Sequence, residues 1–186
     1  EKFIDNKEFW PIFARAEALD VPLYIHPANI HAAVRDAYLS DYTDEYPGLA
    51  TAGWGFPMET ATMGIRIVLS GVLEKYPGLN IILGHLGETL PFLMWRIDLA
   101  LNRPGNDGVE FRKLFTSHFH ITTSGFFSDP AMLCCLQEMG ADRIMFAIDY
   151  PFVPNDPGPV WMERLMLNEE DKDKILHGNA EKLLKI

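Results

Sequence analysis

The stretch Asn80-Ile81-Ile82-Leu83-Gly84-His85-Leu86-Gly87-Glu88 joins a short apolar run to a glycine-rich turn with two ionisable side chains. A run of this kind, closed by a turn, is typical of a strand buried within a parallel sheet. Comparable runs occupy residues 21–27, 119–123 and 143–148. Helical patterns precede or separate the runs, at residues 7–19, 59–76, 89–102 and 129–139. The alternation predicts an α/β fold with right-handed βαβ crossovers and a parallel sheet.

The composition predicts a single domain over residues 1–186. Of the 186 residues, 48% are hydrophobic, and 16 basic against 26 acidic side chains give a net charge of −10. This charge argues against nucleic acid or an anionic membrane as a partner, because both require clustered Lys and Arg. No apolar run approaches the roughly 20 residues that cross a bilayer. Adjacent Cys134 and Cys135 are unsuited to an ordinary structural disulfide, so we expect a cytoplasmic protein.

Residues 28–57, which follow the first predicted strand, show poor periodicity. Aromatic, acidic and glycine residues are frequent in this segment. A long irregular insertion inside a compact domain is usually functional or mobile. We therefore expect residues 28–57 to form a long active-site insertion loop.

Polar side chains stand at the end of every predicted strand: His26, His85, residues 122–124, and Asp149. In barrels and open α/β sheets, the carboxyl ends of parallel strands face the ligand crevice. Two histidines and an aspartate at that edge suit a borderline divalent cation. The glycines of the 84–88 turn would bring Glu88 back to the imidazole of His85, where a carboxylate would fix the tautomer of a general acid or base.

These residues also have structural interpretations. His26, which a proline follows, could simply mark the end of a strand, and Asp149 could cap the next segment. Arg96 on its apolar helix would either form an ion pair, for example with Asp98 or Glu88, or bind a substrate carboxylate. Spacing alone leaves these alternatives open.

Four segments carry a family resemblance: Leu23 to Pro27, Gly84 to Pro91 with Trp95-Arg96, Phe146 to Pro151, and His177 to Ala180. In this order they resemble the amidohydrolase-related family of metal-dependent TIM (β/α)8 barrels. The branch in question holds the aminocarboxymuconate-semialdehyde, γ-resorcylate and 5-carboxyvanillate decarboxylases. The resemblance covers essentially the whole chain and implies a partial barrel, strands 5 to 8 with their helices, from the C-terminal half of such an enzyme.

The resemblance also implies roles for individual residues. His26 and Asp149 match metal ligands, with Zn²⁺ or Mn²⁺ as the expected cofactor, and His85 matches a catalytic histidine that Glu88 would orient. Arg96 matches an arginine that binds substrate across a subunit interface, which implies a homo-oligomer, a dimer or tetramer. The family's H-x-H or E-x-H pair on strand 1 has no counterpart in this sequence, so further metal ligands would lie outside it.

The function expected from these residues is metal-dependent, non-oxidative decarboxylation of a small hydroxylated aromatic or related carboxylic acid. Asp149 would deliver a proton to the ring carbon that loses carbon dioxide, while His85 assists. Phe152 and aromatic residues of the insertion would wall the substrate pocket. Two alternatives remain at this point: a metal-dependent hydrolase of an ester, lactone or amide, and a non-catalytic half-barrel that acts as a folding or interaction module.

Overall fold

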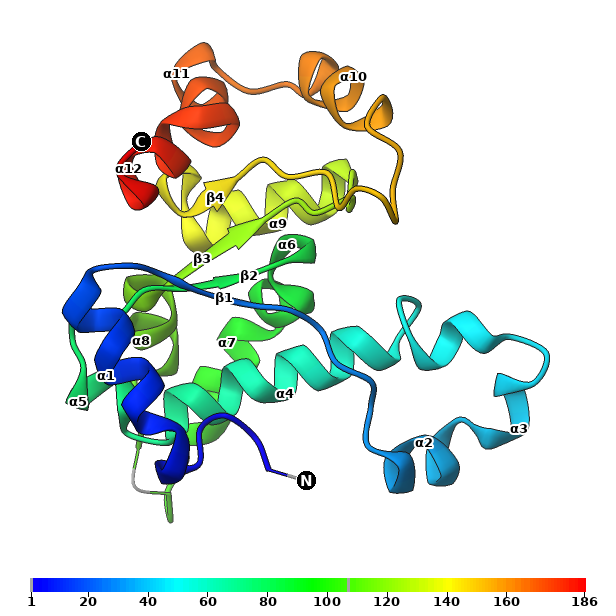
Figure 1. Ribbon diagram of the computed structural model, residues 1–186, viewed down its shortest axis with the longest axis vertical. Helices are drawn as coiled ribbons and strands as arrows, with labels where there is room; N and C mark the ends of the chain where they lie inside the picture. Colours follow the sequence, from blue (N-terminus) through cyan, green and yellow to red (C-terminus); the bar gives the residue numbers. More distant parts are fainter. Residues whose placement is uncertain (1, 107) are drawn as a thin grey trace.

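The centre of the molecule is a four-stranded sheet in the order β1-β2-β3-β4, drawn in Figure 1. The computed structural model describes residues 2–106 and 108–186. The strands are β1 (Leu23–Ile25), β2 (Ile81–Leu83), β3 (Phe119–Thr122) and β4 (Ile144–Met145). All neighbouring strands pair in parallel. The predicted α/β architecture of a partial barrel is thus confirmed.

Helices precede the first strand, connect the strands and follow the last one. In chain order they are η1 (Lys7–Phe9), α1 (Trp10–Leu19), α2 (Ala32–Tyr38), α3 (Ser40–Thr43), η2 (Pro47–Ala50), α4 (Gly55–Leu69), α5 (Val72–Lys75), α6 (His85–Glu88), α7 (Leu90–Leu101), α8 (Phe111–His118), α9 (Asp129–Met139), η3 (Ala141–Arg143), α10 (Pro157–Arg164), α11 (Glu169–Asp173), the π-helical turn η4 (Lys174–Gly178) and α12 (Asn179–Leu184).

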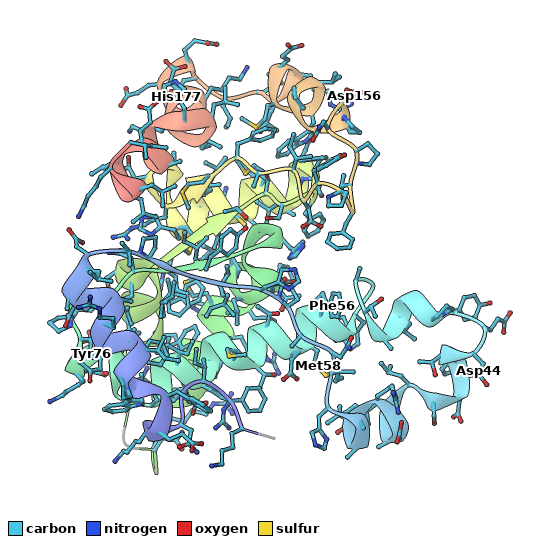
Figure 2. All side chains as sticks on the ribbon, viewed as in Figure 1. Asp44, Phe56, Met58, Tyr76, Asp156 and His177 are labelled. Carbon is cyan, nitrogen blue, oxygen red and sulfur yellow. The ribbon has the colours of Figure 1, made fainter. Side chains whose placement is uncertain are left out.

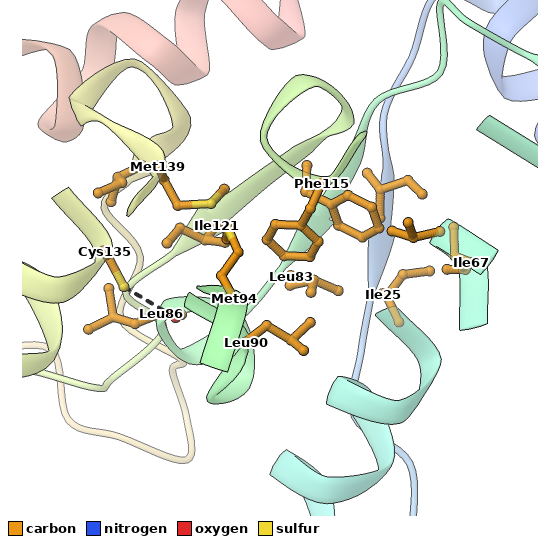
Figure 3. Close-up of a cluster of buried hydrophobic side chains, with 14 of the residues drawn as sticks. Ile25, Ile67, Leu83, Leu86, Leu90, Met94, Phe115, Ile121, Cys135 and Met139 are labelled. Atoms are coloured by element: carbon orange, nitrogen blue, oxygen red, sulfur yellow. Dashed lines mark hydrogen bonds between the residues drawn. The ribbon is translucent and has the colours of Figure 1, made fainter. Parts of the chain in front are cut away.

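The hydrophobic core lies between one face of the sheet and these helices. Ile25, Leu83 and Ile121 point into it from three successive strands, where they meet Met94 of α7 and Phe115 of α8 (Figure 3). Because side chains alternate across a strand, the residues between them point to the opposite face. The register aligns Tyr24, Ile82 and His120 in a row on that face.

Residues 28–57 are not the irregular loop that was expected, because α2, α3 and η2 lie within them. The imidazole of His31 accepts a hydrogen bond from the backbone N–H of Ala33 and so caps α2. Helices this short carry no clear periodicity, which explains the error. Figure 1 shows the segment extending as an arm away from the sheet, with Asp44 near its far end in Figure 2. An active-site role for the arm stays a prediction.

Several predicted boundaries also shift. The helix expected at 59–76 is two helices, because Gly71 adopts a left-handed φ of 82° between α4 and α5. The strand expected at 143–148 pairs only as far as Met145, because the N–H of Phe146 donates to the carbonyl of Ile175 instead of to a strand. Helix α10 begins at Pro157, within the proline-rich segment of residues 151–159. Within the described residues, no helix has both the length and the apolar character that crossing a bilayer requires.

Candidate active site

The parallel sheet collects the predicted residues at one edge. His26 directly follows β1, Gly84 and His85 follow β2, residues 123–124 follow β3, and Asp149 stands four residues beyond β4. All strands run in the same direction, so their carboxyl ends lie at the same edge. The topology therefore brings together side chains from segments far apart in the sequence.

A left-handed turn displays His85. Five successive residues, 85–89, have φ angles of 48°, 54°, 75°, 53° and 70°. For residues other than glycine this conformation costs roughly 1–2 kcal/mol each, so the surrounding structure must hold the turn in place. Gly87 is required for a second reason, since a Cβ there would lie 3.0 Å from both Ile121 and Pro91.

Three contacts hold this turn. The N–H of Gly87 donates to the carbonyl of Gly84 at 2.8 Å, and the side chain of Leu86 is buried in the core. The thiol of Cys135, on α9, donates to the carbonyl of Leu86 at 3.4 Å, drawn as the dashed line in Figure 3. Burial raises the pKa of this thiol to about 12, so it stays a donor at neutral pH.

The turn brings His85 and Glu88 together, as the glycine spacing predicted. Nδ1 of His85 lies 2.6 Å from Oε1 of Glu88, whose side chain is 2% exposed. Nδ1 therefore carries the proton and donates it to the carboxylate, which leaves Nε2 on the side of Asp149. Nε2 lies 3.8 Å from Oδ2 of Asp149. A histidine and two carboxylates thus form a connected row.

The charges in this row raise the pKa of His85. Burial alone would lower it, but the hydrogen bond and charge of Glu88, followed by the charge and hydrogen bond of Asp149, outweigh the burial. The imidazole is accordingly suited to hold a proton near neutral pH and to pass it on.

Asp149 does not cap the following segment with its side chain. Its backbone carbonyl accepts hydrogen bonds from Phe152 and Val153, at 2.9 and 3.1 Å, in a tight turn with φ of 73° at Asp149. Within residues 2–106 and 108–186, the contact recorded for its carboxylate is the one with His85. The capping alternative is therefore wrong.

His26 is exposed, and its ring is oriented by the backbone. Nδ1 lies 2.7 Å from the carbonyl of Pro27, so it donates its proton there and leaves the lone pair of Nε2 free. A backbone carbonyl bonded in this way is a common support for a metal-binding histidine. His26 and Asp149 thus offer one imidazole and one carboxylate, a donor set that suits zinc or manganese. The described residues contain no group of three or more such side chains placed to hold a metal ion.

Arg96 and Phe152 lie on the surface. Arg96 is exposed on α7 beside Phe92 and Trp95, whose side chains are 80% and 66% exposed. In the described residues it pairs with neither suggested carboxylate: Glu88 is bonded to His85, and Asp98 accepts a hydrogen bond from the N–H of Arg112. Phe152 is 80% exposed. Phe152 meets Asp149 through its backbone N–H, which donates to the carbonyl of Asp149. In the described residues, neither the Arg96 nor the Phe152 side chain makes a hydrogen bond or ion pair with the side chain of His85 or Asp149.

Two site residues escaped the sequence-based prediction. The hydroxyl of Tyr24 contacts both Thr122 and Ser124, and the thiol of Cys135 supports the turn that carries His85. Tyr24 had one signal, since it stands two residues before His26 and so shares its face of the strand. Cys135 had none, because 49 residues separate it from Leu86 in the sequence.

Comparison with known sequences decides the family. Residues 2–186 match the sequence profile of the family described as Amidohydrolase. The chain belongs to the amidohydrolase family. This amidohydrolase is 39% identical over 189 residues to the γ-resorcylate decarboxylase of Polaromonas sp. (strain JS666 / ATCC BAA-500), covering 99% of the present chain and 56% of that protein.

Solved structures resemble this amidohydrolase closely. The dihydroxybenzoic acid decarboxylase of Polaromonas sp. JS666, crystallised with manganese and the inhibitor 2-nitroresorcinol, superposes with a TM-score of 0.89 at 38% identity, over 98% of this chain and 55% of that one. The 5-carboxyvanillate decarboxylase of Novosphingobium aromaticivorans DSM 12444, complexed with manganese and 4-hydroxy-3-methoxy-5-nitrobenzoic acid, gives 0.88 at 32% identity, over 100% and 53%. The chain spans about half the length of the relatives it matches.

Proposed function

We propose that this amidohydrolase chain is the C-terminal half, strands 5 to 8, of a metal-dependent non-oxidative decarboxylase of hydroxylated aromatic acids. The observation that carries the proposal is the row formed by Glu88, His85 and Asp149, in which Nε2 of His85 faces Oδ2 of Asp149 at 3.8 Å. The two solved relatives described above support the substrate class, because both are decarboxylases of hydroxylated aromatic acids.

The row can supply what decarboxylation needs. When the bond between the ring carbon and the carboxyl carbon breaks, carbon dioxide leaves and the electron pair stays on the ring, where a proton must replace it. We assign the proton donor to Asp149 and the resupply of that proton to His85, whose pKa is raised by the neighbouring carboxylates of Glu88 and Asp149. Glu88 holds the ring of His85 and balances its charge.

His26 and Asp149 would hold a divalent cation, with manganese in the solved relatives as the precedent. When bound, the cation would act as a Lewis acid on the carboxylate or the neighbouring hydroxyl of the substrate. The remaining ligands would come from sequence outside these residues.

Arg96 supports an oligomer in this proposal. It stands on the exposed apolar face of α7 with Phe92 and Trp95, a face that would be costly to leave in water over a large area. We propose that a second subunit covers this face and that Arg96 binds the substrate carboxylate in the neighbouring site. Phe152 would line the substrate pocket as an aromatic wall.

The test measures carbon dioxide release by the full-length enzyme loaded with Mn²⁺. The substrates are 2,6-dihydroxybenzoate and 5-carboxyvanillate, with a set of esters, lactones and amides in parallel. We expect carbon dioxide from at least one aromatic acid and a loss of about 100- to 10,000-fold in kcat for Asp149→Asn. Turnover of an ester, lactone or amide without carbon dioxide release would establish the hydrolase instead. If no compound is turned over, the decarboxylase proposal fails and the non-catalytic half-barrel is favoured.

A further inference from the structure

Three hydroxyl groups close a triangle near the carboxyl edge of the sheet. The hydroxyl oxygen of Tyr24 lies 2.7 Å from Oγ1 of Thr122 and 2.9 Å from Oγ of Ser124, and those two oxygens lie 2.6 Å apart. Each hydroxyl has one proton, so all three hydrogen bonds form only when every group donates to the next around the ring. The three side chains therefore form one closed unit.

The triangle links β1 to β3 across the strand between them. Tyr24 pairs in register with Ile82 of β2, and Ile82 pairs with His120 of β3, two residues before Thr122. Gly84, the residue directly after β2, lies beside the Tyr24 hydroxyl and Ser124. A Cβ at Gly84 would lie 3.4 Å from Oγ of Ser124 and 3.8 Å from the Tyr24 hydroxyl, so a side chain longer than a methyl group would strike the triangle.

Tyr24 and the neighbouring Gly84 connect the triangle to proposed functional residues. Tyr24 stands two residues before His26, on the same face of its strand. Gly84, against which the triangle rests, is bonded to His85 in the chain and accepts the hydrogen bond that closes the left-handed turn.

Ser124 connects the triangle to Asp149. Ser124 adopts a left-handed φ of 37°, and the next residue, Gly125, lies so close to the segment before Asp149 that a Cβ there would meet the carbonyl of Ile148 at 3.0 Å. On the other side of Ser124, Oγ1 of Thr123 donates to the carbonyl of Ala147 at 2.5 Å. Ser124 is thus fixed against the chain that carries Asp149.

We propose that Tyr24, Thr122 and Ser124 form a hydroxyl brace that sets the distance between His26 and the pair His85 and Asp149. The inference rests on the proposed function, in which His26 and Asp149 bind one cation. Tyr24 is then a positioning residue that acts through His26. Its aromatic ring contributes little to the core, because the residue is 53% exposed, whereas the hydroxyls it meets belong to residues that are 3% and 5% exposed.

The test is Tyr24→Phe in the full-length enzyme, with the Kd for Mn²⁺ as the first readout and kcat and KM at saturating Mn²⁺ as the second. We expect the Kd to rise about 10- to 100-fold, as for other groups that orient metal ligands. We expect kcat to fall while KM stays within about twofold and Tm within a few degrees. Tyr76→Phe is the matched control: its ring packs edge-on against Trp10 and its hydroxyl has no recorded partner in the described residues, so its Kd and kcat should match wild type.

A double variant tests whether the triangle is one unit. Ser124→Ala removes the same Tyr24 contact from the other side. If the brace acts as a unit, Tyr24→Phe combined with Ser124→Ala raises the Kd no more than the more affected single variant does, whereas independent effects would multiply. Wild-type Kd in Tyr24→Phe, or multiplying effects, would overturn the brace.

The two proposals can fail separately. If the wild-type enzyme binds Mn²⁺ but releases no carbon dioxide from any aromatic acid, the proposed reaction fails and the Mn²⁺ affinities alone decide on the brace. If the wild-type enzyme binds no Mn²⁺, both are overturned. If Tyr24→Phe does not fold, Ser124→Ala alone is measured, and an unchanged Kd in that variant overturns the brace.

Discussion

Two histidines on neighbouring strands of the same sheet have opposite surroundings. His85 follows β2 at the carboxyl edge, with Glu88 at 2.6 Å and Asp149 at 3.8 Å, and its pKa is raised. His120 lies within β3, 8% exposed, where Nη1 of Arg143 donates to its Nε2 at 3.4 Å. Burial, followed by the charges of Arg143 and Lys182, lowers the pKa of His120 to about 4.

The difference separates a histidine that can carry a proton from one that cannot. Carboxylates face both nitrogens of His85, and their charges favour the protonated imidazole. His120 stays neutral, and its Nδ1 is buried without a partner in the described residues. His85 and His120 are the same kind of side chain near the same sheet, and the neighbouring charges make His85 the one suited to proton transfer.

The largest expected contrast is in catalysis. His85→Gln in the full-length enzyme should lower kcat about 100- to 10,000-fold, because it removes a group that carries protons. The matched variant His120→Gln should change kcat by less than about fivefold, since the hydrogen bond of His120 in the described residues is with Arg143 and not with the proposed catalytic side chains. Steady-state rates of carbon dioxide release, normalised to folded protein by circular dichroism, measure both. Equal losses in the two variants would contradict the contrast.

The next effect is on stability as a function of pH. The pKa of His120 is 6.5 in the unfolded chain and about 4 in the folded one, so between these values the unfolded state binds more protons. The free energy of unfolding should therefore fall as the pH is lowered from about 6.5 to about 4, by at most about 3 kcal/mol from this residue. His85 works in the opposite direction: its raised pKa stabilises the fold below pH 6.5, and that contribution is lost as the pH rises through the folded value.

Urea unfolding of wild type and His120→Gln between pH 4 and pH 7.5 measures this dependence. The difference in unfolding free energy between the two proteins should shrink toward acid pH, because wild type alone loses the contribution of a neutral His120. A difference that stays constant over this range would show that His120 is not held neutral.

A smaller effect is expected when the carboxylate of Glu88 is neutralised. Glu88→Gln keeps the size of the side chain but removes the charge and the strongest hydrogen bond of His85. The pKa of His85 should fall below the wild-type value, and kcat about 10- to 100-fold. NMR titration of the imidazole resonances measures the pKa. Glu138→Gln, at a carboxylate that pairs with Arg112 on the helix side, is the control and should leave the His85 titration unchanged.

The smallest effect is expected from the thiol below the turn. Cys135→Ala removes the donor to the carbonyl of Leu86 and should cost about 1 kcal/mol of unfolding free energy, the typical value of one hydrogen bond. The alanine variant should also lose some kcat, because the turn that carries His85 is held less firmly. Cys135→Ser restores a hydroxyl donor and should recover part of that kcat. Thermal unfolding and kcat measured on both variants check this, and a serine variant no better than alanine would mean that the donor is unimportant.

Much of the fold was predictable because its signals are local. Apolar runs such as Ile81–Leu83 predicted all four strands, and the helices between them required parallel pairing. The contact between His85 and Glu88 was also predictable, since glycines flank the turn and only three residues separate the pair. The helices of the 28–57 arm were missed because each is too short to show a helical period.

The remaining parts depend on tertiary contacts. The reach of Tyr24 to Ser124 requires the strand order and register, and 100 residues separate the two. The early end of β4 follows from Ile175, whose carbonyl takes the N–H that a longer strand would have used. The neutral state of His120 depends on its burial and on Arg143 of η3, and no pattern around His120 indicates that arginine.

The central claim is that the carboxyl edge holds a metal through His26 and Asp149, next to His85. The most direct measurement is a crystal structure of the full-length enzyme with Mn²⁺, with the ion located by its anomalous scattering. We predict a single manganese peak within about 2.0–2.3 Å of Nε2 of His26 and of a carboxylate oxygen of Asp149, the usual range for such ligands. A peak bound elsewhere, or an edge that takes up no manganese, would contradict the account.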